Sequence, residues 1–476
     1  MKPVHDKKGV TIYHGDCVEV MRGLPDNSVD SIVTDPPYGI RFMGKAWDGA
    51  DIEKQTAKRR SYGTNAPGAG PQGGHNSAAA NAGQYDLSLT ANQAFAEWTR
   101  VWSVEAFRVL KPGGHMLVFC GPRTYHRMAS GVEDAGFEIR DQIMWIYGSG
   151  FPKSLDISKA IDKAAGAERE VISEGSPVKR MIPGADQDKT GSWIKDNGRG
   201  FVPSETAPAT PEAITWDGWG TALKPAHEPI VVARKPLIGK VIENVLEYGA
   251  GGINIDASRI QGPPWKWGKQ TDIKGGGFGT KRPSEGDVLA EDVESDPKGR
   301  WPSNIILDPE AAKLLDRQSG ESTSKQAEVS NKGSIWGSEN DAIDIRGHDD
   351  SGGASRFFYI AKASASDRDE GLEGMPLKEC GMMEDDNYPI ETGSGNVRDT
   401  KRRNFHPTVK PTVLMQYLVR LVTPPGGTTF DMFMGSGSTG KAAVREGFKF
   451  IGVEREAEYI PMAIARINAP AQVELF

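Results

Sequence analysis

Apolar residues recur along the first 150 positions with two different periods. Short runs rich in β-branched side chains predict buried strands, and longer stretches with apolar residues three or four apart predict amphipathic helices. The predicted strands are residues 10–16, 29–34 and 115–120, and the predicted helices are 17–25 and 91–111. Residues 129–148 then predict a helix, a turn and a strand. Strands that alternate with helices are typical of an α/β domain with a mostly parallel sheet.

The same alternation returns near the carboxyl terminus. Helices are predicted at 412–423 and 438–447, and strands at 428–433 and 449–454. The middle of the chain differs: 41–90 is a long polar insertion that we expect to be mobile, and 241–350 is rich in glycine and charge with little periodicity. We therefore predict one doubly wound α/β domain whose halves, 1–240 and 351–476, are separated by a variable block at 241–350.

Composition narrows the class of protein. The 476 residues are 37% hydrophobic and 25% charged, and 57 glycines and 31 prolines indicate long loops. No apolar run approaches the roughly 20 residues of a membrane helix, and the first residues lack the apolar core of a signal peptide. Three cysteines, Cys17, Cys120 and Cys380, lie far apart, which suits a reducing cytoplasm and predicts no metal site. The net charge of −7 gives no support to a nucleic-acid partner, so DNA binding would need local basic patches.

A glycine motif, "DMFMGSGSTGKA", spans residues 431–442 between a predicted strand and a predicted helix. Gly435, Gly437 and Gly440 match the spacing G-x-G-x-x-G, and Glu454 ends the next predicted strand. Glycines there allow a tight turn close to a ligand, and the acid can bind ribose hydroxyls, so the motif favours a dinucleotide or another nucleoside-type cofactor. The motif also approaches a P-loop, but Ala442 stands where a Ser or Thr would bind magnesium.

A second motif, "TDPPYG", follows the predicted strand 29–34. Prolines cannot continue a sheet ladder, so Asp35 and Tyr38 are held at the end of the strand, where open α/β sheets bind ligands. The Asp35 carboxylate and the Pro36 carbonyl offer two acceptors, and Tyr38 offers a flat face. That combination suits an exocyclic amine on a planar base.

Together, "TDPPYG" and "FMGSGSTG" resemble the signature pair of the S-adenosylmethionine-dependent DNA amino-methyltransferases. Their order resembles the permuted class, in which a target-recognition region lies between the catalytic and cofactor motifs. "YHGDC" and "HPTVKP" also resemble segments of that family, and two further stretches resemble phage-type members. The resemblance implies a Rossmann-like methyltransferase fold with 1–240 as the catalytic half, 241–350 as the recognition region and 351–476 as the cofactor-binding half.

The resemblance also implies roles for individual residues. Catalysis is assigned to Asp35, Pro36, Pro37 and Tyr38. The residues assigned to binding of the cofactor S-adenosyl-L-methionine are Asp16, Asp431, Phe433, Gly435, Gly437, Gly440, Glu454, His406 and Lys410. An Asp at the head of the tetrapeptide favours the N6 amine of a flipped adenine in double-stranded DNA. N4-cytosine modification is the alternative, and a dinucleotide-dependent oxidoreductase is an alternative of another class.

Several basic stretches are candidates for DNA contact. Lysines and arginines serve phosphates well, and aromatic residues interleaved with them suit nucleic acid. The candidate residues are Lys401, Arg402, Arg403, Trp265 and Trp267, with a further basic stretch at 57–63. We find no nuclease motif, so a methylase acting alone or beside a separate restriction enzyme is predicted. Its predicted location is the cytoplasm of a bacterial or phage-infected cell, at the nucleoid, as a monomer or homodimer.

Overall fold

The computed structural model places its described residues in two compact units. The first unit is Met1–Gly148, His227–Gly371 and Thr408–Phe476, and the second is Ser149–Ala226 and Leu372–Pro407. The described residues are 2–39, 89–150, 154–174, 204–260, 299–324, 327–330, 343–346, 350–361, 365–379, 390–391, 397–398 and 401–470. The insertion predicted at 41–90 therefore lies almost wholly outside them. No helix within these ranges is long and apolar enough to span a membrane.

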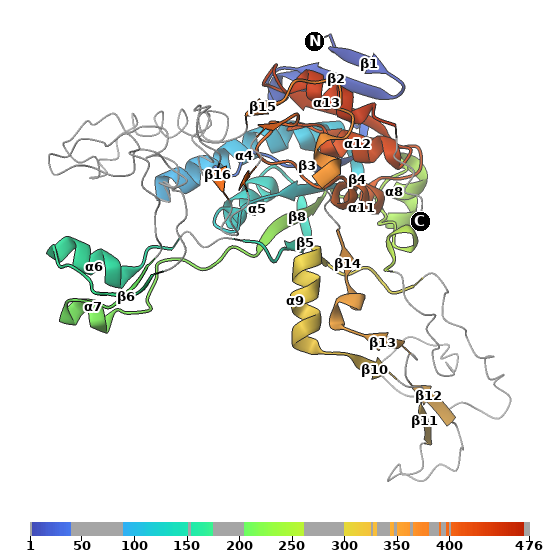
Figure 1. Ribbon diagram of the computed structural model, residues 1–476. Coiled ribbons are helices and arrows are strands. Elements are labelled where there is room, and N and C mark those ends of the chain that lie inside the picture. Colours follow the sequence, from blue (N-terminus) through green and yellow to red (C-terminus); the bar gives the residue numbers. More distant parts are fainter. Residues whose placement is uncertain are drawn as a thin grey trace. The chain divides into compact units, whose positions relative to one another are not determined.

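A ten-stranded sheet forms the first unit, in the order β1-β2-β20-β19-β3-β4-β8-β5-β9-β14 (Figure 1). Its strands are β1 (His5–Lys7), β2 (Val10–His14), β3 (Val29–Thr34), β4 (Leu110–Phe119), β5 (Glu138–Ile146), β8 (His227–Arg234), β9 (Ile305–Leu307), β14 (Tyr359–Ile360), β19 (Thr428–Asp431) and β20 (Lys449–Glu454). β1 pairs antiparallel with β2, and β8 pairs antiparallel with both β4 and β5. The remaining neighbours are parallel, which confirms the predicted α/β fold with a mostly parallel sheet.

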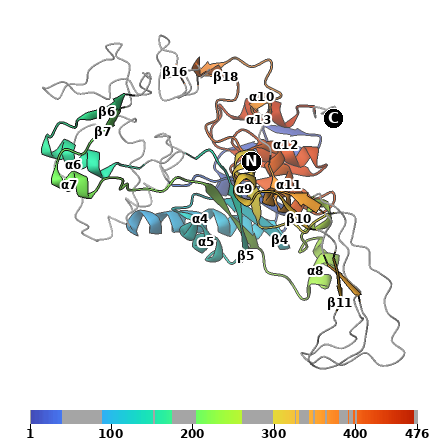
Figure 2. The ribbon, with the colours of Figure 1, turned by 60° about the horizontal axis from the view of Figure 1, so that its bottom comes forward.

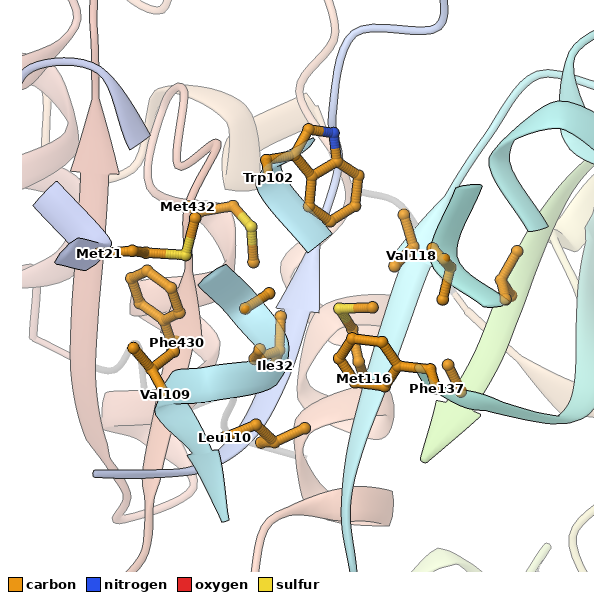
Figure 3. Packing of buried hydrophobic residues seen from close by; sticks show 14 of the residues in the cluster. Met21, Ile32, Trp102, Val109, Leu110, Met116, Val118, Phe137, Phe430 and Met432 are labelled. Carbon is orange, nitrogen blue, oxygen red and sulfur yellow. The ribbon is translucent and has the colours of Figure 1, made fainter. Parts of the chain in front are cut away.

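Helices cover both faces of this sheet. The alternation within β3 and β4 shows it directly: Ile32 and Met116 face one core, whereas Val33 and Leu117 face the other. The first core holds α1 (Cys17–Arg22), α4 (Leu89–Val109) and α5 (Tyr125–Glu133), and part of it is drawn in Figure 3, with Trp102 above Met116 and Ile32. The opposite face is covered by α11 (Thr412–Val422), α12 (Ser438–Arg445) and α13 (Ile460–Ile467). A sheet buried on both faces favours strands rich in apolar residues, as in β4 from Met116 to Phe119.

The helix predicted at 91–111 ends two residues early, and the strand after it begins earlier than expected. β4 starts at Leu110 and runs through the Pro112–Gly114 turn that we expected to separate helix from strand. The pairing with β3 jumps from Val29↔Leu110 to Ser31↔His115, so the turn is accommodated as an irregularity within the ladder.

The block at 241–350 contains more regular structure than its composition predicted. Its described elements include α8 (Val241–Tyr248), η3 (Asp256–Ser258), β9 and α9 (Pro309–Ser319), and β9 joins the main sheet. Asp308 caps α9 by accepting from the backbone of Ala311, and Pro309 occupies the first turn, a start signal that the sequence reading overlooked. The target-recognition role predicted for 241–350, and the division of the methyltransferase domain on either side of it, stay predictions.

Short elements complete the first unit after α9. Two antiparallel pairs join β10 (Ser322–Ser324) with β13 (Asp350–Gly352) and β11 (Ala327–Ser330) with β12 (Ile343–Arg346). η4 (Ala354–Phe357) precedes β14, and α10 (Ala365–Asp369) follows it. Figure 2 shows α4 and α5 side by side from a second direction, in agreement with Figure 1.

The described residues of the second unit form two short helices and three two-stranded pairs. The helices are α6 (Ile157–Ala165) and α7 (Pro211–Thr215), and the pairs are β6 (Val171–Glu174) with β7 (Ser204–Thr206), β15 (Lys378–Glu379) with β18 (Lys401–Arg402), and β16 (Ile390–Glu391) with β17 (Val397–Arg398). Buried Asp162 joins these elements by accepting from the Arg169 guanidinium and from the backbone and hydroxyl of Thr210.

Candidate active site

The two sequence motifs lie side by side at one edge of the sheet. β3 and β19 are parallel neighbours, paired at Ile32↔Phe430, so both motifs follow strands that end at the same edge. A buried hydrogen bond joins them directly: the Thr34 hydroxyl donates to Asp431 Oδ1 over 2.7 Å. Residues almost 400 positions apart therefore share one site, as the motifs predicted.

Asp35 is the centre of a compact group of four side chains. Its Oδ2 accepts from Lys410 Nζ at 2.6 Å, and its Oδ1 accepts from the Tyr38 hydroxyl at 2.9 Å. The same hydroxyl lies 2.9 Å from Glu228 Oε2, and Lys410 Nζ lies 3.3 Å from that oxygen. Two carboxylates, one ammonium group and one phenol are thus held within direct contact.

Burial governs the charges in this group. It raises the pKa of Asp35 above its usual range, while the adjacent Lys410 ammonium opposes the rise. For Lys410, burial pulls the pKa down, but Asp35 and Glu228 outweigh it and raise the value above normal. The pKa of Tyr38 rises well above 10 because the ring is buried beside Asp35 and Glu228. We conclude that Lys410 stays cationic and holds Asp35 as an acceptor.

Sequence reasoning missed Glu228 and undervalued Lys410. Glu228 is the second residue of β8, and because β8 runs against its neighbours, the start of β8 lies at the edge where the other strands end. Sequence reasoning assigned Lys410 to the cofactor and did not pair it with Asp35; its side chain is only 9% exposed, and the residue lies just before α11. The available signal was "HEP" directly before an apolar run, which places an acid at the start of a strand.

The glycine motif forms the turn between β19 and α12. Gly435 and Gly437 adopt φ angles of 53° and 78°, which favour glycine. A Cβ atom on Gly437 would lie 3.1 Å from the backbone of Ala463, and one on Gly440 would lie 2.6 Å from the side chains of Phe450 and Ile467. The first glycines therefore shape the turn, and the third permits close packing of α12.

Two buried carboxylates brace this turn. Asp431 accepts from the hydroxyls of Thr34 and Thr439 and from the backbone of Phe433, and burial raises its pKa to about 6. Glu454 accepts hydrogen bonds of 2.7 Å from the backbone N–H groups of Gly435 and Glu456. Burial raises the pKa of Glu454 to about 7. Both acids sit at strand ends beside the turn, as predicted, and each has a structural function in holding it.

Asp16 and Phe433 also lie at this edge of the sheet. Asp16 caps α1 by accepting from the backbone of Val18 and Glu19, and the preceding Gly15 donates to the carbonyl of Glu454. The ring of Phe433 packs against α4, with its centroid 5.6 Å from that of Trp102. Asp16 thus follows β2, the neighbour of β20, and Phe433 lies in the segment that leads from β19 into the glycine turn.

The lysine of the P-loop-like sequence has another partner. Lys441 is buried and donates to Asp367 and Glu370, each at 2.8 Å. Arg445 also pairs with Glu370, so α12 is tied to the segment around α10 by ion pairs. Lys441 thus serves the packing of α12, in agreement with the argument against an NTPase.

The other predicted residues lie outside the first unit or outside the described residues. Lys401, Arg402, Arg403 and His406 belong to the second unit, where β18 carries the first two and the His406 backbone donates to Asn404. Trp265, Trp267 and the stretch 57–63 lie outside the described residues. Their assigned roles stay predictions.

A glycine turn beside an acidic strand end, at the carboxyl edge of a parallel sheet, defines an α/β protein of the class that binds nucleoside-type ligands. A family model described as DNA methylase, of the N6/N4 methyltransferases, matches residues 29–465. The chain therefore belongs to the N6/N4 family of DNA methylases, which confirms the family indicated by the two motifs.

Individual relatives match over shorter stretches. The type II methyltransferase M.HindIII of Haemophilus influenzae is 30% identical over 148 residues, 28% of this chain and 42% of that protein. M2.LlaDCHI of Lactococcus lactis subsp. cremoris is 39% identical over 82 residues, 17% of this chain and 30% of the relative. This chain thus spans less than half the length of either relative. The solved structure of the PvuII DNA methyltransferase (cytosine-N4-specific) is 12% identical with a TM-score of 0.37, covering 99% of this chain and 90% of that one, a likeness too weak to indicate function.

Proposed function

We propose that this protein is a site-specific methyltransferase that moves a methyl group from S-adenosyl-L-methionine to the N6 amine of a flipped adenine in double-stranded DNA. The observation that carries the proposal is the Asp35 carboxylate, which is held as an acceptor by Lys410 at 2.6 Å and lies one strand away from the glycine turn. Membership of the DNA methylase family supports the same reaction. It gives no support to the oxidoreductase alternative.

Asp35 would act on the target amine as a hydrogen-bond acceptor. An exocyclic amine conjugated to its ring has little lone-pair density, so it is a poor nucleophile until its hydrogens are drawn out of the ring plane. A carboxylate offers about four lone-pair positions, so Asp35 can accept from the amine while it keeps Lys410 and Tyr38. The Pro36 carbonyl supplies the second acceptor, and both stabilise the charge that develops on nitrogen.

Tyr38 would supply a face for the target base. Flipping a base out of the duplex costs a few kcal/mol, and stacking on an aromatic ring returns roughly 1–3 kcal/mol. The ring is fixed at two points: the backbone carbonyl of Tyr38 accepts from the Thr124 hydroxyl at 3.1 Å, and its phenol is held by Asp35 and Glu228. A ring fixed before the base arrives loses little entropy when stacking occurs.

The glycine turn fits S-adenosyl-L-methionine by its shape and its charges. Backbone at Gly435 and Gly437 is free of side chains, and the Asp431, Glu454 and Asp16 carboxylates end three neighbouring parallel strands or lie just beyond them. Carboxylates there can accept from the hydroxyl and amino groups of the cofactor, and Phe433 can contact its adenine. When bound, the cofactor supplies an already activated methyl group, so this chain needs no covalent intermediate.

The choice of adenine depends on Asp35, because an Asp at the head of the tetrapeptide resembles the adenine-modifying members of the family. Cytosine N4 is the second candidate, since its amine offers the same two N–H donors. Residues 241–350, around β9, are our proposed source of target recognition, with the basic residues 401–403 as proposed phosphate contacts. Phage origin and nucleoid association stay predictions.

One experiment tests the reaction, the base and the site together. Plasmid DNA is incubated with the pure protein and S-adenosyl-L-methionine, digested, and examined by mass spectrometry for N6-methyladenine and N4-methylcytosine. Single-molecule sequencing of the same DNA maps the modified positions. N6-methyladenine confined to one short sequence is the expected result, and N4-methylcytosine alone would transfer the proposal to the second candidate. DNA with no methylated base would refute both.

A further inference from the structure

Methylation of an amine leaves one proton to be removed. When the S–CH₃ bond breaks and the N–CH₃ bond forms, the nitrogen carries the new methyl group, both of its hydrogens and a positive charge. One of those hydrogens must leave as a proton to give the neutral product. This inference rests on the proposed function and concerns the destination of that proton.

Asp35 is the first acceptor available, but it is poorly placed to pass a proton to water directly. Both of its oxygens already have partners, Tyr38 on Oδ1 and Lys410 on Oδ2, so the proton has to leave through one of these neighbours. Lys410 cannot receive the proton from Asp35, because an ammonium group has three donors and no acceptor. The remaining neighbour is the Tyr38 hydroxyl, which can accept a proton through one lone pair while it releases its own.

The Tyr38 hydroxyl stands between two carboxylates at equal distances. It lies 2.9 Å from Asp35 Oδ1 and 2.9 Å from Glu228 Oε2, and it has one hydrogen to share between them. A hydroxyl that bridges two acids can take a proton from one and give its own to the other without moving its ring. Simple support of the ring would need only one of these contacts.

Glu228 has the position of a terminal acceptor. Its side chain is 22% exposed, so its carboxylate can exchange protons with water. Lys410 Nζ lies 3.3 Å from Glu228. Within the described ranges, Tyr147 and Cys120, which directly follow β5 and β4, also interact with it. Burial first and Glu228 second raise the pKa of Tyr147 to about 12, and the pKa of Cys120 is also raised, so both stay neutral and do not compete for the proton.

We propose that Asp35, the Tyr38 hydroxyl and Glu228 form a proton relay that carries the proton of the methylated amine to solvent. Asp35 takes the proton from nitrogen, Asp35 passes it to the Tyr38 oxygen, and Tyr38 releases its own hydrogen to Glu228. Glu228 then gives the proton to water, and the relay returns to its starting state. Lys410 pairs with both acids between turnovers. Glu228 is a positioning residue for the proton and does not contact the base.

Single-turnover methylation of a short duplex at saturating cofactor tests the relay. Glu228→Gln removes the terminal acceptor with little change in size, and we expect the rate constant to fall at least about tenfold, a smaller loss than the roughly 10²–10⁴-fold of direct acid–base catalysis. Binding of DNA and cofactor should stay within about twofold of wild type. Adding small buffer bases such as imidazole should speed Glu228→Gln in proportion to their concentration and leave wild type unchanged. Glu228→Asp should recover part of the rate.

Tyr38→Phe and Glu446→Gln complete the set. Tyr38→Phe keeps the ring but breaks the relay, so its rate should fall as in Glu228→Gln, while fluorescence of 2-aminopurine at the target position still reports base flipping. Glu446, at the end of α12, pairs with Arg420 of α11. Glu446→Gln removes this acid, and the variant should methylate DNA at the wild-type rate.

Three results for Glu228→Gln would overturn the relay. A Glu228→Gln rate equal to that of wild type would exclude it, and so would a slow rate that buffer bases do not raise. A fall explained by lost binding would assign Glu228 to structure alone. Wild-type protein that methylates cytosine would refute only the choice of adenine, since that amine also loses a proton. Wild-type protein with no methylation would refute the proposed function and the relay together.

Discussion

Lys410 is the one cation in the group around Asp35, and its replacement has consequences that can be worked out from the structure. Lys410→Met keeps a chain of similar length but removes the charge that lies 2.6 Å from Asp35 and 3.3 Å from Glu228. Removing one partner of a buried ion pair costs about 3–5 kcal/mol, and because these carboxylates keep some exposure, we expect about 2–3 kcal/mol of lost unfolding free energy.

The same substitution should change the pH dependence of methylation. Burial raises the pKa of Asp35 and Lys410 opposes that rise, so without Lys410 the pKa rises further. At a given pH a smaller fraction of Asp35 is then ionised, and a protonated acid is a weaker acceptor for the target amine. We expect single-turnover rates near pH 7 to fall at least about tenfold and the acidic limb of the profile to move to higher pH.

Two measurements separate the effects of Lys410→Met. Urea unfolding followed by tryptophan fluorescence gives the stability, and single-turnover rates between about pH 5.5 and 9 give the profile. Lys111→Met is the matched control, because Lys111 also lies 2.6 Å from a carboxylate, that of Asp30, in the same unit. An active Lys410→Met protein whose pH profile coincides with that of wild type would refute the assigned role of Lys410.

Three further predictions concern the strand end and the glycine turn. Asp35→Ala should lower methyl transfer by about 10²-fold or more while cofactor affinity by calorimetry stays within about twofold, and near-normal turnover would contradict the mechanism. Gly437→Asp should abolish cofactor binding, since the φ of Gly437 is 78° and a Cβ there would meet Ala463. The control Gly252→Asp, where a Cβ would lie in open space, should bind the cofactor normally. Equal cofactor affinities of the two variants would argue against the site. Burial raises the pKa of Glu454 to about 7, so its contribution to stability is present below about pH 4.5 and lost as pH rises through 7. Glu454→Gln should remove that part of the pH dependence of the unfolding free energy. An unchanged slope of unfolding free energy against pH in this variant would refute the raised pKa.

Much of the site was predictable because it is built from local signals. Val33 and Thr34 mark a buried strand, and the prolines after Asp35 end it, so the position of the acid follows from sequence alone. Gly435 and Gly437 need positive φ, and only a turn before a helix explains them both. Since parallel strands end at one edge, two such motifs in one chain predicted a shared site.

The remainder depended on long-range geometry. The position of Lys410 next to Asp35 requires the segment before α11 to reach the end of β3, and no local pattern in "HPTVKP" encodes that distance. The helices α8 and α9 were missed because glycine and charge around them lowered the apparent periodicity of the block. Asp16 was assigned to the cofactor by resemblance, whereas its visible function is to cap α1.

The reversed strand β8 explains why the least predictable residue is also the one that completes the group. In a wholly parallel sheet, functional side chains at the carboxyl edge come from residues that follow strands, and a search of the sequence looks there first. A strand inserted in the opposite direction brings its first residues to the same edge, so Glu228 meets Tyr38 from the neighbouring side of β4. Because Tyr38 needs a ring face for the base and a hydroxyl for the acids, the second acid has to approach from outside its own strand. An antiparallel neighbour supplies that approach without any added loop.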